Sequence, residues 1–135
     1  KQACKVTLSD HEVDVDVIDF DADRISPDKK GSKGIRVVGS RSHMNDATEA
    51  FVDSLGHGNR EVEIVSKGSS LKFCLVAEGK ADVYPRFAPT MEWDTAAGQA
   101  ICEAVGFEVI SKETNQPLLY NKEDLLNPWF IVGGK

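Results

Sequence analysis

The sequence lacks the features that mark membrane, secreted and nucleic-acid-binding proteins. In its 135 residues, no apolar run approaches the roughly 20 residues that a membrane helix needs. The first ten residues, KQACKVTLSD, do not contain the long apolar core of a secretory signal. The formal net charge of −6 argues against non-specific binding to nucleic acid. We therefore expect neither a membrane nor a nucleic-acid partner, and a chain of this length can form one domain with its own core.

Cysteine is also scarce. The three residues Cys4, Cys74 and Cys102 are odd in number and far apart, and they match neither a zinc site nor a CxxC motif. This spacing predicts reduced thiols in a reducing compartment, so we expect a cytoplasmic protein. Cys74 and Cys102 fall within helical patterns, where a core position is the simplest interpretation.

A strand, a loop and a helix follow one another three times beyond residue 34. This order is typical of an α/β fold, a mostly parallel sheet flanked by helices. Two further strands are expected at 106–111 and 127–134, with a short strand or edge at 118–120. The three repeats place strands at 34–38, 61–65 and 81–87, and helices at 47–56, 70–79 and 90–106.

Residues before the first repeat have a different pattern. Alternating valines over residues 1–23 predict an antiparallel strand pair, and a polar, glycine-containing link follows it. We therefore divide the chain into residues 1–34, a strand pair and link, and residues 35–135, an α/β domain.

Local signals set the helix ends and faces. Asn45 or Asp46 is expected to cap the first helix, and glycines at 56, 79 and 106 are expected to end the three helices. One stripe of the second helix carries Leu71, Cys74, Leu75 and Glu78. Helical spacing predicts that the third helix buries Ala97, Ala100, Ile101, Ala104 and Val105.

The loops that follow the three strands are expected to meet at one edge of the sheet, where ligands of α/β proteins bind. Ser69 and Ser70 begin the second helix, where exposed N–H groups, two hydroxyls and the helix dipole favour an anion. The alternative is that one of these serines is only an N-cap.

Basic side chains gather at the same predicted edge. Arg41 and His43 lie in the first loop, Lys72 in the first turn of the second helix, and Arg86 after the third strand. Each could be a solvated surface charge when taken alone. Together, in an acidic chain, they favour a polyanionic small molecule as the ligand.

Asp94, at the start of the third helix, is a carboxylate at an edge that otherwise suits anions. It could simply cap its helix. A divalent cation bridging Asp94 to a phosphate would also explain it. The small residues Ala96, Ala97 and Gly98 then suggest that a ligand comes close to the backbone there.

The motif WDTAAGQAI, residues 93–101, resembles the second signature of the inositol monophosphatase superfamily of metal-dependent phosphatases. The segments SRSH, GSSLKFCLVAEGKADVYPRF and NPWF resemble its 3′(2′),5′-bisphosphate nucleotidase branch. The resemblance covers residues 35–132, and Lys72 after GSSL favours the nucleotidase branch. It implies the C-terminal domain of the inositol monophosphatase-like fold.

The resemblance also implies an activity: removal of the 3′-phosphate of 3′-phosphoadenosine 5′-phosphate to give AMP, in cytoplasmic sulfur metabolism. It makes Asp94 a ligand of a catalytic Mg²⁺. His43, Ser69, Lys72 and Arg86 correspond to family positions that contact the nucleotide, and Arg41 and Ser70 are weaker correspondences. In the family, a metal-activated water attacks phosphorus in line.

The sequence departs from the family in one large respect. The superfamily's other metal ligands, a glutamate and two aspartates of a D-P-[LI]-D-G-[ST] motif, belong to an N-terminal half that is absent here. DVIDFD, residues 16–21, has Val17 and Phe20 where that motif has Pro and Gly, so no role is assigned to it. We expect the chain to be inactive without a partner, the missing N-terminal half. The alternatives are a phosphatase acting on inositol phosphates or sugar bisphosphates and a non-catalytic nucleotide-binding module.

Overall fold

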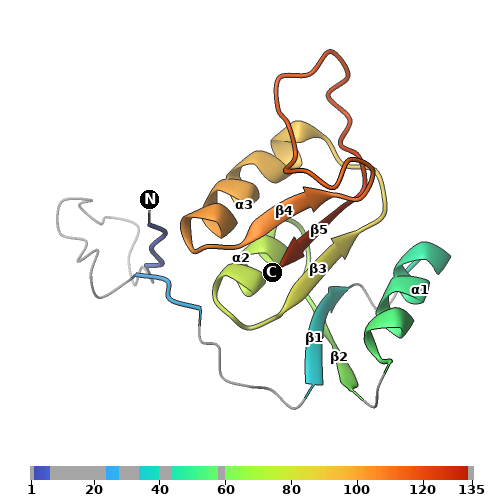
Figure 1. Ribbon diagram of the computed structural model, residues 1–135. Helices are drawn as coiled ribbons and strands as arrows, with labels where there is room; N and C mark the ends of the chain where they lie inside the picture. The colour runs from blue at the N-terminus through green and yellow to red at the C-terminus, as the bar shows by residue number, and fades with distance from the viewer. Residues whose placement is uncertain (1, 7–23, 28–33, 40–43, 58–59, 134–135) are drawn as a thin grey trace.

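The structure, a computed structural model, describes residues 2–6, 24–27, 34–39, 44–57 and 60–133 (Figure 1). Within these ranges a single sheet is flanked by helices. The strands are β1 (Gly34–Gly39), β2 (Glu61–Ser66), β3 (Val83–Arg86), β4 (Glu108–Ser111) and β5 (Phe130–Gly133), and the helices are α1 (Asp46–Leu55), α2 (Leu71–Ala77) and α3 (Glu92–Ala104).

The sheet has the strand order β2-β1-β3-β5-β4. Strand β1 pairs in parallel with β2 and β3, and β5 pairs antiparallel with β3 and β4. Four strands therefore run in one direction and β5 runs in the other, which confirms the predicted α/β fold with a mostly parallel sheet. The parallel pairs need crossover connections, which α1 and α2 provide.

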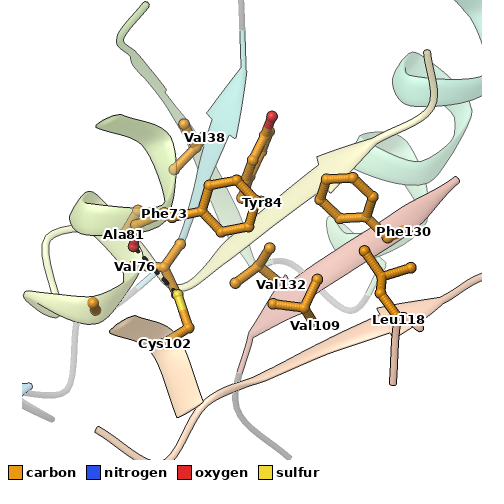
Figure 2. Close-up of a cluster of buried hydrophobic side chains, with 11 residues drawn as sticks. Val38, Phe73, Val76, Ala81, Tyr84, Cys102, Val109, Leu118, Phe130 and Val132 are labelled. Carbon is orange, nitrogen blue, oxygen red and sulfur yellow. Dashed lines mark hydrogen bonds between the residues drawn. The ribbon is translucent and has the colours of Figure 1, made fainter. Parts of the chain in front are cut away.

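Helices α2 and α3 pack side by side against the sheet, whereas α1 stands apart from them beside β1 and β3 (Figure 1). The core fills the space between this helix pair and the sheet (Figure 2). At its centre the Phe73 ring meets Tyr84 edge-on, with ring centroids 5.4 Å apart, and stacks on Phe130 at 5.9 Å. Aromatic pairs at such distances prefer these edge-on and stacked arrangements.

The predicted face of α3 is only partly right: Ile101 and Val105 pack against the core as expected. The helix buries Thr95, Gly98, Gln99 and Cys102, with Glu92 at its start, while Ala97 and Ala100 are exposed. Three of the buried residues, Glu92, Thr95 and Gln99, are polar. The Tyr120 hydroxyl lies 2.8 Å from Gln99 Oε1 and 3.3 Å from Thr95 Oγ1, and Thr95 Oγ1 also accepts from Asn127 Nδ2 at 3.0 Å. Because these side chains have hydrogen-bond partners, they can be buried at low cost.

Helix α2 differs from expectation in a similar way. It buries Phe73, Val76 and Ala77, and Leu71 is 56% exposed. The expected stripe of Leu71, Cys74, Leu75 and Glu78 therefore lies at the edge of the surface that α2 packs against α3 and the sheet. Its last member, Glu78, is half-buried and pairs with Lys5 and Lys80.

Most of the predicted boundaries are confirmed. Asn45 caps α1, its Oδ1 accepting from Thr48 N at 2.9 Å, and Gly56 follows the helix. Gly79 and Gly106 end α2 and α3 with φ of 68° and 90°, a left-handed conformation that glycine adopts without steric cost.

Of two further expected strand regions, one forms no strand and the other lies mostly outside the described residues. Residues 118–120 form no strand; the neighbouring Pro117 makes only an isolated bridge with Ile110. Of the N-terminal strand pair, the described residues contain one antiparallel bridge, between Cys4 and Arg24. The rest of that pair, residues 7–23, lies outside the described residues.

The core position predicted for Cys102 is confirmed. Its side chain is buried, its Sγ donates to the Phe73 carbonyl at 3.5 Å, and burial raises the pKa of the thiol to about 12. Cys74 is half-buried, and both are free thiols. In the described part of the chain, no helix is long and apolar enough to cross a membrane.

Candidate functional site

A cavity of about 360 Å³ opens between the starts of α2 and α3, beside the end of β3. Five of the seven predicted site residues line it: Ser69, Ser70, Lys72, Arg86 and Asp94. The other two, Arg41 and His43, lie outside the described residues. The remaining lining residues are Phe73, Tyr84, Pro89, Thr90, Trp93, Thr95, Ala97, Gly98 and Phe130.

The cavity wall at the start of α2 carries the two serines. Ser70 occupies the N-cap position, but its backbone is already helical and its side chain makes no capping hydrogen bond. Ser69 has φ of 55°, a left-handed conformation that is uncommon for a residue other than glycine. The interpretation of Ser70 as a side-chain cap is therefore not supported, and its hydroxyl is not needed to begin the helix.

Two basic side chains enter the cavity from neighbouring elements. Lys72 Nζ lies 5.6 Å from the centroid of the Tyr84 ring, within the range of a cation–π interaction. Burial, and then the positive charge of Arg86, lower the pKa of Lys72. Burial raises the pKa of Tyr84. A bound anion would relieve the repulsion between the two cations, because it is attracted to both.

The guanidinium group of Arg86 has one nitrogen with a hydrogen-bond partner and another, Nε, without one among the described residues. Its Nη2 donates to the Pro89 carbonyl at 3.1 Å. Its Nε is buried and, among the described residues, has no hydrogen-bond partner. A buried donor without an acceptor is costly, and a phosphate oxygen in the cavity would supply one.

Asp94 faces the cavity from the first turn of α3. Its Oδ2 accepts a hydrogen bond from Met91 N at 2.8 Å, so it does cap the helix start. A carboxylate offers about four lone-pair sites on two oxygens, so this bond leaves acceptor capacity for a cation. Asp94 is exposed and can be reached from solvent.

The described residues do not form a complete metal site. They contain no group of three or more His, Cys, Asp or Glu side chains that could hold an ion. Magnesium takes six oxygens in an octahedron, so Asp94 fits the role of one ligand but does not complete such a site with these residues alone.

Two of the three small residues after Asp94, Ala97 and Gly98, line the cavity, and Gly98 also makes room for a side chain of α2. A Cβ atom added to Gly98 would lie 2.4 Å from Cγ of Phe73. The missing side chain of Gly98 therefore makes room for Phe73, and both residues line the cavity. Ala96 does not line it.

Sequence reasoning did not single out Tyr84 and Thr90 as lining residues. It also missed the polar contacts that hold the start of α3, which involve Glu92, Thr95 and Asn127. The alternation of strand β3 could have suggested Tyr84. Nothing local could have suggested the others, because their partners lie about 30 residues away along the chain.

A cavity lined by two cations, one carboxylate and several hydroxyl groups at the edge of an α/β sheet can hold a phosphorylated small molecule. The chain belongs to the inositol monophosphatase family, which it matches over residues 20–129.

Within that family, it is similar to two enzymes named 3′(2′),5′-bisphosphate nucleotidase CysQ. It is 49% identical over 96 residues to that of Salmonella typhimurium and 50% identical over 97 residues to that of Escherichia coli K12. Each match covers 71% of this chain and 37% of the relative. The chain therefore spans little more than a third of the length of these relatives.

Solved structures give the same fold. The crystal structure of CysQ from Bacteroides thetaiotaomicron is 59% identical with a TM-score of 0.72, covering 81% of this chain and 40% of that one. The structure of 2′AMP-bound SaIMPase-II is 17% identical with a TM-score of 0.63, covering 84% of this chain and 42% of that one, and it supports the fold alone.

Proposed function

We propose that this chain provides the phosphate-binding side of a magnesium-dependent phosphatase that converts 3′-phosphoadenosine 5′-phosphate to AMP. The observation that carries the proposal is the single cavity lined by Lys72, Arg86 and Asp94. It occurs in a chain 49 to 59% identical to proteins named CysQ. By this proposal the reaction belongs to cytoplasmic sulfur metabolism.

The substrate carries two phosphates, and the cavity offers donors for them. Lys72 and Arg86 attract the charge, and the hydroxyls of Ser69 and Ser70 donate hydrogen bonds to phosphate oxygens. Arg41 and His43 are proposed as further contacts to the nucleotide. The buried Nε of Arg86 gains an acceptor when phosphate is bound. These groups bind and orient the substrate, and none of them is proposed as the general base.

Asp94 is proposed to hold Mg²⁺ together with ligands from the part of the family's length that this chain does not span. A bound Mg²⁺ lowers the pKa of water and stabilises the leaving oxygen. Overall, water adds an oxygen to the phosphoryl group, the bond from phosphorus to the 3′-oxygen breaks, and that oxygen takes a proton. The contribution of Asp94 to this reaction is to place the metal beside the phosphate held by the cations.

The proposal is tested with the full-length natural protein. Inorganic phosphate release is measured with 3′-phosphoadenosine 5′-phosphate, inositol 1-phosphate and fructose 1,6-bisphosphate, each with Mg²⁺ and with excess EDTA. We expect the highest kcat/KM for the nucleotide and loss of activity in EDTA. Preference for inositol or sugar phosphate would support the alternative substrate class. Nucleotide binding without phosphate release under every condition would support a non-catalytic binding module.

A further inference from the structure

The start of α3 is tied to a distant segment of the chain by backbone hydrogen bonds. Met91 and Leu126 form an isolated antiparallel bridge. On either side of it, Glu92 N donates to the Leu125 carbonyl at 3.0 Å and Asn127 N donates to the Thr90 carbonyl at 2.8 Å. Thr90 and Met91, just before α3, and Glu92, its first residue, are therefore held against residues 125–127.

This pairing decides where the Met91 N–H points. In an antiparallel pair, the N–H and C=O groups of neighbouring residues face the partner strand and the opposite side in alternation. Because Thr90 and Glu92 supply the groups that face residues 125–127, the Met91 N–H points away from them. It donates instead to Asp94 Oδ2, at 2.8 Å. The orientation of the Asp94 carboxylate thus depends on the segment paired with residues 90–92.

The Glu92 side chain makes a second set of hydrogen bonds to the same part of the chain, at residues 121 and 122. Its carboxylate accepts from Asn121 N at 2.7 Å and from Lys122 N at 3.2 Å, and it pairs with Lys122 Nζ. Asn121 has φ of 62°, a left-handed conformation. When one residue has a left-handed backbone conformation, its own N–H and the N–H of the next residue can both point towards one anion. Glu92 is only 9% exposed, so its carboxylate is committed to this turn and does not line the cavity.

A third connection lies on the other side of Asp94. The Asn127 side chain donates through Nδ2 to Thr95 Oγ1 at 3.0 Å and to Thr90 Oγ1 at 3.3 Å. Thr95 follows Asp94 directly and is buried. Residues before Asp94 and the residue after it are therefore anchored to the segment 121–127.

We propose that Glu92 is a positioning residue for Asp94: by clamping residues 90–92 to the 121–127 segment, it aims the Asp94 carboxylate at the metal. This inference rests on the proposed function. Groups that hydrogen-bond to metal ligands fix ligand orientation, and their loss costs about 10- to 100-fold in metal affinity or activity. By this proposal Glu92 does not bond to Asp94 directly. It acts through the Met91 N–H and has no contact with the substrate.

The test uses the full-length natural protein and Glu92→Gln. An amide keeps the size of the side chain but sets an NH₂ group against the donors of either residue 121 or residue 122, and it removes the charge that pairs with Lys122. The matched control is Glu103→Gln, the same change on an exposed residue of the same helix. Metal affinity is measured directly by Mn²⁺ binding in electron paramagnetic resonance and by Mg²⁺ titration calorimetry, without turnover.

We expect Glu92→Gln to weaken metal binding about 10-fold or more, and to leave KM for the nucleotide within about twofold because the cations are untouched. Glu103→Gln should change neither. In a background of Asp94→Asn, Glu92→Gln should have no further effect on metal affinity, because both changes act through one carboxylate. A role in stability alone would lower the melting temperature and leave metal affinity unchanged, which would overturn the inference.

A second pair of variants covers the case in which Glu92→Gln does not fold. Asn121→Gly keeps the left-handed backbone and should retain metal affinity, whereas Asn121→Val strains that backbone and should weaken metal binding. Equal metal affinity in the two variants would contradict the proposal. Failure of the proposed function would look different, since the wild-type protein itself would then release no phosphate from the nucleotide.

Discussion

The starts of α2 and α3 line the same cavity but are built in opposite ways. Helix α2 begins at Ser70 without a side-chain capping bond, and Ser69 before it is left-handed. Helix α3 begins with Asp94 bonded to Met91 N, and the residues before it are paired with a distant segment. One start leaves its hydroxyls available to a ligand, while the other fixes a carboxylate in place. The difference fits the proposed function, by which the phosphate moves in and out at α2 and the metal ligand Asp94 stays still.

The largest effect is expected from Asp94→Asn in the full-length protein. We expect kcat to fall by several orders of magnitude, because the metal loses an anionic ligand beside the phosphate. The helix should still form, since the Asn amide oxygen can accept the Met91 N–H. Phosphate release and thermal unfolding measure the two properties. Normal kcat in this variant would contradict the role of Asp94, and Glu103→Gln serves as the control.

Lys72→Ala tests the start of α2. We expect KM for the nucleotide to rise about 10- to 100-fold, the size of a lost hydrogen bond to a charged group, with a smaller fall in kcat. The control is Lys112→Ala, since Lys112 Nζ lies over the Phe87 ring, 4.2 Å from its centroid, and does not line the cavity. A thousandfold loss of kcat with unchanged KM would show that Lys72 acts in the chemical step.

Gly98→Ala tests how closely α3 approaches α2. The added Cβ would lie 2.4 Å from Phe73 Cγ, so the ring or the helix must move, and we expect a loss of about 1 to 3 kcal/mol in unfolding free energy. Gly68→Ala is the comparison, because a Cβ there would meet nothing within 4 Å. Denaturant titration should separate the two variants. Equal stability would mean that the helices have more room than the structure gives them.

The smallest effects are expected from substitutions at two helix N-caps, Asn45 and Ser70. Asn45→Ala removes a side chain that accepts from Thr48 N and donates to the Phe87 carbonyl, and we expect a loss of about 1 kcal/mol. Ser70→Ala removes a hydroxyl that caps nothing, so unfolding free energy should stay the same while KM for the nucleotide rises. A clear loss of stability in Ser70→Ala would restore the interpretation of that serine as a cap.

The sequence was a good guide to the order of elements and to which loops share an edge. Strand and helix signals repeat along the chain, and Lys72, Arg86 and Asp94 lie in one cavity as expected. It was a poor guide to helix faces. Thr95 and Gln99 can be buried because Tyr120 and Asn127, more than 20 residues away along the chain, supply part of their hydrogen bonds. Helical spacing counts apolar residues and has no information about such distant partners.

The place of β5 in the sheet affects when the domain can fold. Residues 130–133 lie between β3 and β4, and Phe130 and Val132 carry fully buried side chains. Until those residues leave the ribosome, β3 and β4 have no shared neighbour and the Phe73 ring lacks its stacking partner. Folding of the sheet must therefore wait until residues 130–133 have been synthesised, and truncation before Phe130 would leave two exposed strand edges that invite aggregation.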